Sequence, residues 1–341
     1  MRWRKLASGL VATTLLLATG ASAQDDVGFQ SFLQSIRGRA LSEGVRPATF
    51  DSVAASLTFN PRVVELDRQQ PEASPNAPIP NFAPYKAQHV DAARIGRGRA
   101  AYQRERPRLE RIERETGVPE SIMVAIWGHE TNYGAYTGNF DLPRSLASLA
   151  YEGRRRQLFT DEFIATLKMI DRGVPRDRLK GSWAGAFGYP QFLPSVYLRL
   201  ARDGDGDGRA DIWSNPADTL ASIANYFVNA GWRAGQPWGF AVTLPAGFDR
   251  AGMTNRTLSP RCPRVHDRHS RWRTIGEWRR LGIVSQDGGW PTDDVLATVM
   301  EPDGPGRTAY LLTGNYRVIL DYNCSNFYAL SVGLLADEVA R

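Results

Sequence analysis

The sequence predicts a mainly helical α+β protein, and three observations support this fold class. Residues 27–57, 85–133 and 142–171 carry apolar side chains at the three- and four-residue spacing of amphipathic helices. An acidic, glycine-rich loop follows at 203–211. From 238 to 320 the pattern changes to short apolar alternations between Pro and Gly turns, which is typical of strands. We therefore expect a helical protein with a small α+β lobe inserted before its last helix.

The N-terminus has the pattern of a secretory signal. A basic stretch at 1–5 precedes an apolar run at 6–19 and the small residues Ala21-Ser22-Ala23, so we expect a signal peptide at 1–23 with cleavage after Ala23. The apolar run is too short to span a bilayer as a permanent helix, and no later stretch is apolar for long enough. No cysteine lies near the cleavage site for lipid attachment. The expected product is a soluble periplasmic protein without a transmembrane segment.

The charge balance gives no case for nucleic acid as a partner. The formal net charge of the whole chain is +6, and loss of Arg2, Arg4 and Lys5 with the signal would leave +3. A mild positive charge would suit an anionic polymer, although many unrelated proteins share it.

The remaining chain is expected to form four parts. The first is a helical part at 24–116, with helices from Val27 to a turn at 44–47, from 47 to 57 and from 85 to 115, and an extended segment at 70–84. The other three are a catalytic core at 117–237 that includes a loop at 203–218, the α+β lobe at 238–321, and a C-terminal motif and helix at 322–341 that return to the core.

The stretch 118–134 is predicted to form a helix from Pro119 to Tyr133. Pro119 suits the first helical turn, where its missing N–H has no cost, and Gly134 suits a left-handed turn at the end. Helices are also expected at 142–151 and 159–171.

Glu130 is the predicted catalytic residue. It would lie on one face of this helix with Met123, Ile126 and Trp127, close to the negative end of the helix dipole. Both effects raise the pKa of a carboxyl group, which is what a general acid requires. The alternative is an exposed glutamate in a final helical turn. The neighbouring His129 is interpreted as structural.

The loop at 203–211 matches positions one to nine of a calcium-binding EF-hand. Asp203, Asp205 and Asp207 would supply side-chain oxygens and Arg209 its carbonyl, with Gly208 at the sharp turn. Three carboxylates so close in sequence repel one another unless a cation lies among them. We therefore expect a structural Ca²⁺, with a solvated acidic turn as the alternative.

The twelfth position of this loop departs from the EF-hand pattern. A bidentate glutamate is usual there, and the chain has Ser214 instead. Asp218 lies close by in the sequence and could provide the missing carboxylate. The helix that follows, 218–230, has an apolar stripe and would be anchored by the ion.

The chain has only two cysteines, Cys262 and Cys324. In an exported protein a disulfide between them is favoured over two separate thiols. Such a bond could stabilise the fold by about 4 kcal/mol. No metal-ligand or redox spacing surrounds either residue, so its role should be structural.

Four short segments of the lobe are predicted to be strands because they are apolar and lie between turn residues. They are 240–244, 295–299, 308–312 and 317–320. A final helix is expected at 327–339.

Two further stretches join the Glu130 helix in a resemblance to a known family. They are the Gly-rich, aromatic segment 181–195 and the C-terminal segment 322–330. In this order, with the acidic loop between them, they resemble the membrane-bound lytic transglycosylase B family of murein-cleaving enzymes, from about Phe29 to the C-terminus. The resemblance implies a lysozyme-like helical catalytic lobe.

The resemblance also implies which residues bind the sugar. Ser182, Tyr189 and Gln191 would line the cleft, and Asn323, with two tyrosines, would position the muramic residue. These tyrosines are Tyr322 and Tyr328. The residues themselves add Tyr133, in a polar, aromatic loop that suits a pyranose ring and its N-acetyl group.

The implied reaction uses one glutamate twice. Glu130 would protonate the bond between N-acetylmuramic acid and N-acetylglucosamine, and would then take the proton from the C6 hydroxyl as a 1,6-anhydro ring closes. No cofactor is needed for these steps. The partner would be peptidoglycan glycan strands, whereas the proteins that recruit the enzyme are unknown. The alternatives are a lysozyme-like hydrolase, which admits water, and a non-catalytic murein-binding protein.

Overall fold

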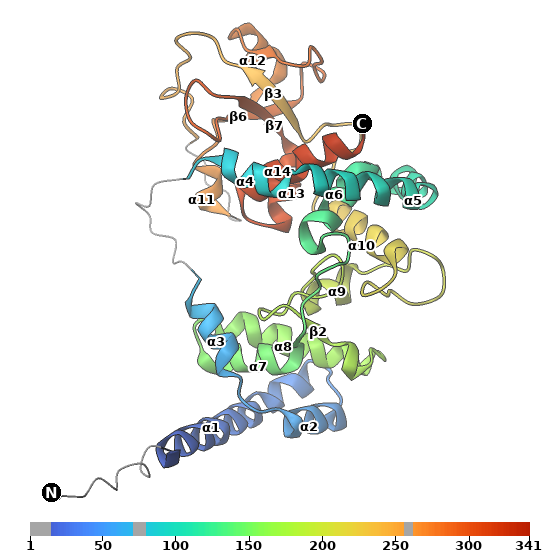
Figure 1. Cartoon of the computed structure of the whole chain (residues 1–341), viewed down its shortest axis with the longest axis vertical. Helices are drawn as coiled ribbons and strands as arrows, with labels where there is room; N and C mark the ends of the chain where they lie inside the picture. Colours follow the sequence, from blue (N-terminus) through green and yellow to red (C-terminus); the bar gives the residue numbers. More distant parts are fainter. Residues whose placement is uncertain (1–14, 71–79, 256–261) are drawn as a thin grey trace, which may run out of the picture. The chain divides into compact units, whose positions relative to one another are not determined.

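A computed structural model describes residues 15–70, 80–255 and 262–341 (Figure 1). The predicted signal peptide therefore lies mostly outside the described residues, and its last part, from Leu15, opens helix α1 (Leu15–Ser42). Within the described range, no helix is both long enough and apolar enough to cross a membrane.

The chain divides into two compact units and passes between them repeatedly. Unit 1 comprises Met1–Glu72, Gly138–Phe187 and Phe192–Leu198. Unit 2 comprises Ala73–Thr137, Gly188–Gln191 and Arg199–Arg341. The predicted core at 117–237 contributes to both units, and its boundaries stay a prediction.

Unit 1 is almost entirely helical. Its elements are α1, α2 (Pro47–Ser56), α3 (Pro61–Arg68), α7 (Leu142–Glu152), α8 (Arg156–Asp171), the short helix η1 (Arg176–Arg178), the start of α9 (Pro194–Leu200), and a two-stranded ladder of β1 (Phe140–Asp141) and β2 (Lys180–Gly181). The buried faces of α1, α2, α3, α7 and α8 share one apolar core. The predicted helices at 47–57, 142–151 and 159–171 are confirmed.

Helix α3 is an addition to the predicted helices. Asn60 caps it by accepting a hydrogen bond from the backbone N–H of Arg62, and Pro61 occupies the first turn. An Asn-Pro pair before apolar residues is a recognised start signal for a helix. The sequence therefore contained the information for α3, in its cap.

Unit 2 is built around helix α6 (Glu120–Thr131), which lies in the apolar core that α5, α10, α13 and α14 also line. The surrounding helices are α4 (Phe82–His89), α5 (Ala92–Thr116), α10 (Pro216–Asn229), α13 (Gly314–Tyr322) and α14 (Asn326–Val339). The predicted single helix from 85 to 115 is wrong, because Asp91 caps a new helix by accepting from the N–H of Arg94 and so separates α4 from α5.

Helix α6 is also shorter than predicted. It ends at Thr131 rather than Tyr133, because Asn132 and Tyr133 both have left-handed backbones, with φ of 51° and 61°. Asparagine tolerates this conformation better than most residues. The left-handed turn therefore begins two residues before Gly134.

A five-stranded antiparallel sheet completes unit 2, in the order β4-β6-β7-β3-β5. Its strands are β3 (Gly239–Thr243), β4 (Arg273–Thr274), β5 (Val284–Ser285), β6 (Leu296–Met300) and β7 (Ala309–Thr313). The short helices α11 (Pro263–His266) and α12 (Ile275–Arg280) accompany it. The strands predicted at 240–244, 295–299 and 308–312 are thus confirmed within a residue.

Both faces of the central strand β7 are buried. Ala309 and Leu311 belong to a small core of the lobe that includes Trp278, whereas Tyr310 and Leu312 belong to the core around α6. Successive strand residues point to opposite faces, so one strand serves both cores. The lobe is therefore an insertion on the main core, as predicted.

The strand predicted at 317–320 is wrong, because these residues lie in α13. Thr313 caps α13 by accepting from the N–H of Asn315, and Val318, Ile319 and Leu320 are all buried. A short run that is apolar on all sides does not distinguish a strand from a buried helix.

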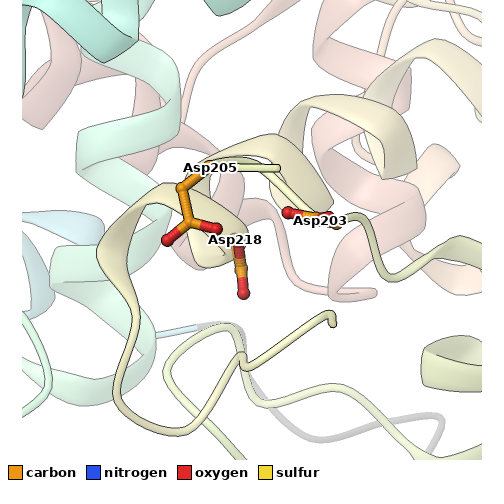
Figure 2. Close-up of side chains that lie close together, drawn as sticks. All are labelled: Asp203, Asp205 and Asp218. Carbon is orange, nitrogen blue, oxygen red and sulfur yellow. The ribbon is translucent and has the colours of Figure 1, made fainter. Parts of the chain in front are cut away.

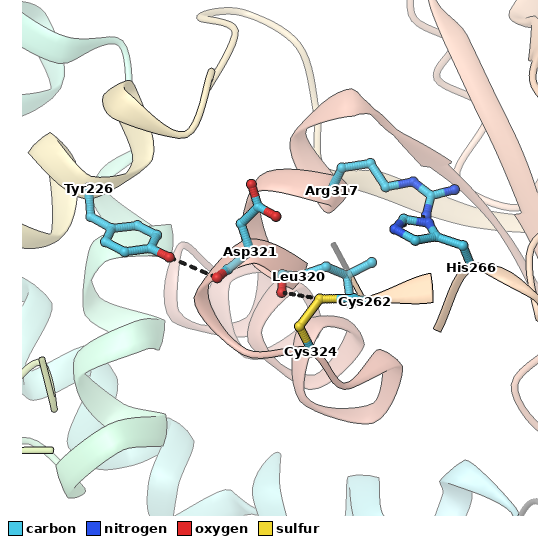
Figure 3. The surroundings of a disulfide bond; sticks show 7 residues. All are labelled: Tyr226, Cys262, His266, Arg317, Leu320, Asp321 and Cys324. Atoms are coloured by element: carbon cyan, nitrogen blue, oxygen red, sulfur yellow. Dashed lines mark hydrogen bonds between the residues drawn. A yellow bond between two sulfur atoms is a disulfide. The ribbon is translucent and has the colours of Figure 1, made fainter. Parts of the chain in front are cut away.

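The predicted disulfide between Cys262 and Cys324 is present, with Cα atoms 5.4 Å apart (Figure 3). Cys324 immediately precedes Ser325, which caps α14 by accepting from the N–H of Tyr328. The disulfide thus ties the segment before α11 to the start of α14.

Candidate active site

Glu130 lies in the last turn of α6 and is half-buried. Its Oε1 accepts a hydrogen bond of 2.5 Å from the hydroxyl of Tyr328 on α14. Within the described parts of the chain, this carboxyl group makes no other hydrogen bond. Oε2 therefore has no hydrogen-bond partner among the described residues.

Burial raises the pKa of Glu130 above its ordinary value of 4.5, and the hydrogen bond from Tyr328 lowers it in part, so that the resulting pKa is about 7. The cause is the loss of hydration, which penalises the ionised form. A carboxyl group with this pKa exchanges its proton readily near neutral pH. Such a group can act as acid and as base in one reaction cycle.

The negative charge of Glu130 affects the pKa of three tyrosines of unit 2. Burial raises the pKa of Tyr85, Tyr322 and Tyr328, and the glutamate charge raises each further. Their hydroxyl groups therefore stay protonated at neutral pH and can donate hydrogen bonds. The sequence had indicated Tyr322 and Tyr328 but not Tyr85, which lies far away in the chain on α4.

Residues 188–191 belong to unit 2, and their backbone is hydrogen-bonded to the end of α6 and to α13. The carbonyl of Tyr189 accepts from Thr131 Oγ1 at 3.0 Å, and that of Pro190 accepts from the Tyr322 hydroxyl at 2.5 Å. Gln191 donates to the carbonyl of Gly188 at 2.9 Å and has a left-handed backbone, with φ of 49°. The predicted residues Tyr189, Gln191 and Tyr322 thus form one hydrogen-bonded assembly at the end of α6.

The aromatic rings give this assembly a rigid base. Tyr189 stacks on Trp127, with ring centroids 5.7 Å apart, and Tyr133 meets the same indole edge-on at 5.9 Å. The Tyr133 hydroxyl donates to the carbonyl of Arg94. This hydroxyl therefore has no free proton to donate to a sugar, although its ring and its lone pairs remain.

Two predicted sugar-binding residues are in different settings. Asn323 is exposed at the end of α13. Ser182 belongs to unit 1, where its Oγ accepts from the backbone N–H of Ala186 at 3.0 Å. Sequence reasoning placed both residues at the cleft, and these roles stay predictions.

His129 is bonded on both ring nitrogens, to the Ala125 carbonyl at 3.1 Å and to Ser331 Oγ at 2.8 Å. Burial, together with the charge of Arg94, lowers the pKa of His129 from 6.5 to about 3. The imidazole is therefore neutral. Ser331 had no signal in the sequence, because its importance depends on how α14 packs against α6.

Three carboxylates of the predicted calcium loop converge, namely those of Asp203, Asp205 and Asp218 (Figure 2). One oxygen from each lies within 4.8 Å of the others. Asp218 is fully buried, and both of its oxygens accept backbone N–H groups, from Gly204 and Asp211. Burial raises the pKa of Asp218, and the charges of Asp205 and Asp203 raise it further.

Asp207 is not part of this cluster. Its carboxylate instead accepts the backbone N–H of Arg209, two residues on, at 2.8 Å. Asp203 accepts the N–H groups of Gly206 and Gly208, and Gly208 has a left-handed backbone with φ of 87°. The loop thus turns as an EF-hand does, but its converging donor set is 203, 205 and 218.

The sequence matches the family described as Transglycosylase SLT domain over residues 28–337. Membrane-bound lytic murein transglycosylase B from Escherichia coli (strain K12) is 29% identical over 289 residues, which cover 81% of this chain and 73% of the relative. SltB3 from Pseudomonas aeruginosa, solved in complexes with NAG-NAM-pentapeptide and NAG-anhNAM-pentapeptide, is 40% identical. It matches with a TM-score of 0.81 and covers 92% of this chain and 79% of its own.

A second solved relative is the Escherichia coli lytic transglycosylase SLT35 in complex with calcium. It is 26% identical, with a TM-score of 0.72 and coverage of 93% of both chains. These matches confirm the predicted mainly helical, lysozyme-like α+β fold class. The chain therefore belongs to the transglycosylase SLT domain family, as its resemblance to lytic murein transglycosylases predicted.

Proposed function

We propose that this protein is a lytic murein transglycosylase that uses Glu130 as its only acid and base. It would cleave the β-1,4 bond between N-acetylmuramic acid and N-acetylglucosamine. Family membership supports an enzyme that acts on peptidoglycan. The single observation that carries the assignment of Glu130 is its geometry: one carboxyl oxygen is held by Tyr328, and the other has no partner in the described residues.

The first step is protonation of the leaving oxygen. The Tyr328 hydroxyl donates a hydrogen bond to Oε1 of Glu130. The carboxyl proton of Glu130 therefore resides on Oε2. Oε2 gives this proton to the glycosidic oxygen while the bond from that oxygen to C1 of the muramic residue breaks. The acetamido oxygen of the substrate stabilises the positive charge that develops at C1.

The second step closes the ring. The C6 hydroxyl oxygen bonds to C1, and its proton passes to Glu130, which is then ready for the next cycle. Tyr328 stabilises the carboxylate between the steps, since a hydrogen bond to an ionised group is stronger than one to a neutral group. In the described part of the chain, no carboxylate shares a hydrogen bond or a pKa effect with Glu130. This supports a cycle with one acid used twice, rather than the two carboxylates of most glycosidases.

The surrounding residues would position the sugar. Asn323 is exposed and could contact the acetamido group directly. Gln191 donates from its Nε2, which leaves Oε1 to accept from a sugar hydroxyl. Tyr322 would act through Pro190, whose carbonyl it holds. Ser182 remains a proposed sugar contact.

The test is mass spectrometry of soluble products from purified murein, digested by the protein and in parallel by Glu130→Gln. We expect 1,6-anhydro-muropeptides from the first and no products from the second. Products heavier by one water would identify a hydrolase. Absence of products from both, with a folded wild-type protein that sediments with murein, would favour a binding protein.

We further propose that Asp203, Asp205 and Asp218 hold a structural Ca²⁺. The convergence of three carboxylates on one another, one of them fully buried, fits a divalent cation with oxygen ligands. The calcium complex of the relative SLT35 supports the same ion. The Arg209 carbonyl could add a ligand, whereas Asp207 would need to turn from its bond to the Arg209 N–H. The ion would stabilise the loop before α10 and take no part in the reaction.

A periplasmic location is proposed from the secretory signal at 1–23. Peptidoglycan strands would be met there. Cell fractionation with antibody against the native protein would test it, and recovery in the cytoplasm would contradict it.

A further inference from the structure

His129 precedes Glu130 on α6 and contacts α14 at two places. Its Nε2 lies 2.8 Å from Ser331 Oγ. Its ring also meets the ring of Tyr328 edge-on, with centroids 5.6 Å apart and planes at 78°. Ser331 and Tyr328 are three residues apart on α14, so they lie on the same side of that helix.

The hydrogen bonds of His129 indicate which of its ring nitrogens carries the proton. A neutral imidazole has one N–H and one lone pair. The Ala125 carbonyl can only accept, so Nδ1 carries the proton and Nε2 accepts from the Ser331 hydroxyl. Ser331 Oγ also lies 2.8 Å from the carbonyl of Tyr328. The Ser331 hydroxyl has one proton, which can be shared with either His129 Nε2 or the Tyr328 carbonyl. His129 is therefore joined to α14 through the Ser331 side chain, and to Tyr328 through the contact between their rings.

We propose that His129 is a positioning residue, which together with Ser331 fixes α14 against α6 so that the Tyr328 hydroxyl is held at Glu130 Oε1. The inference rests on the proposed role of Glu130 as acid and base. His129 does not touch the carboxyl group through a hydrogen bond of its own. It acts on Glu130 through Tyr328.

The groups around His129 keep it neutral, which this role requires. Arg94 from α5 and His89 from α4 both lower the pKa of His129, after burial. Arg94 donates to the Gly128 carbonyl at 3.0 Å, and His89 stacks on His129 at 6.1 Å. The groups that sense the Glu130 charge are Tyr85, Tyr322 and Tyr328, from α4, α13 and α14. None of these carries a charge at neutral pH, so loss of the Tyr328 contact would be the main change at Glu130.

The experiment measures murein-cleavage rate against pH for the wild type, His129→Leu, His129→Gln and Tyr328→Phe. Loss of the Tyr328 hydrogen bond raises the pKa of Glu130, so the alkaline limb should move up by about one pH unit in Tyr328→Phe. We expect the same displacement in His129→Leu. His129→Gln should stay close to the wild type, because its amide can still bond Ser331.

Two further variants separate positioning from general loss of stability. Leu109→Ala removes a side chain from the same core and should lower Tm without moving the alkaline limb. Ser331→Ala removes one hydroxyl and should move the limb as His129→Leu does, which keeps the test valid if His129→Leu fails to fold. A wild-type limb in both His129→Leu and Ser331→Ala would overturn the inference. Full activity of Glu130→Gln would instead overturn the proposed function.

Discussion

Tyr328 and Glu130 are 198 residues apart in the sequence and are joined by a hydrogen bond of 2.5 Å between α14 and α6. This bond lowers the pKa of the candidate catalytic group, whereas burial, the larger effect, raises it. Burial alone would raise the pKa of Glu130 above 7. The hydrogen bond from Tyr328 lowers it, so that the pKa is about 7. The two opposing effects leave the carboxyl group able to give and to take a proton.

Wild-type activity should fall as pH rises through about 7. In the proposed reaction Glu130 must be protonated to begin, and its pKa is about 7, so the acid form is lost above that pH. In Tyr328→Phe we expect the fall at higher pH, together with a rate lowered about tenfold at pH 6 by the loss of a charge-stabilising donor. The measurement is release of soluble muropeptides from labelled murein between pH 4 and 9. An unchanged pH profile in the variant would show that the hydrogen bond does not tune Glu130.

Glu130→Gln should be more stable than the wild type at alkaline pH. The folded-state pKa of about 7 exceeds the ordinary value of 4.5, so the folded protein binds this proton more tightly than the unfolded chain does. That stabilisation is complete below pH 4.5 and is lost as pH rises through 7, at a cost of about 3 kcal/mol. Urea unfolding of both proteins at pH 4.5 and pH 8 tests it. The free-energy difference should grow with pH, and a difference independent of pH would contradict the buried environment of Glu130.

Calcium should raise Tm by a few degrees, and chelation should reverse the increase. Asp218→Asn should abolish this calcium-dependent increase, because the buried Asp218 is central to the three-carboxylate cluster. Asp207→Asn is the matched control and should keep most of the increase, since its carboxylate lies outside the cluster. Differential scanning calorimetry with calcium and with EDTA provides the measurement. Equal loss in both variants would favour the EF-hand ligand set predicted from the sequence.

Removal of the disulfide by Cys262→Ser with Cys324→Ser should lower the free energy of unfolding by about 4 kcal/mol. The bond joins residues 62 apart, and Cys324 lies next to the cap of α14. Reducing agent should lower the Tm of the wild type and leave that of the double variant unchanged. If reducing agent lowered the Tm of both proteins equally, the decrease would not be caused by loss of this disulfide.

Features that depend on local spacing could be predicted from the sequence. The helical period placed Glu130 on an apolar face. The EF-hand-like spacing of the acidic loop predicted the sharp turn at Gly208. The cap at Asn60 also carried a local signal, so α3 was within reach. The strand predicted at 317–320 failed because a buried run has the same apolar composition in a helix and in a strand.

Features that depend on packing between distant helices could not be predicted. Tyr85, Ser331 and His129 meet only because α4 and α14 lie against α6, and no spacing within one helix encodes that. Asp207 also differs for a physical reason. The carboxylate of Asp207 accepts a hydrogen bond from the backbone N–H of Arg209, two residues later. This local bond competes with an orientation in which Asp207 would point toward the other three carboxylates.

The path of the chain between the two units has a consequence for biosynthesis. The residues of unit 1 are all made once Leu198 has been added, whereas unit 2 needs α14. A chain interrupted anywhere before α14 lacks Tyr328 and Ser331, so a ribosome that stalls releases no competent wall-cutting enzyme. The candidate acid Glu130 is therefore synthesised 198 residues before the tyrosine that bonds it.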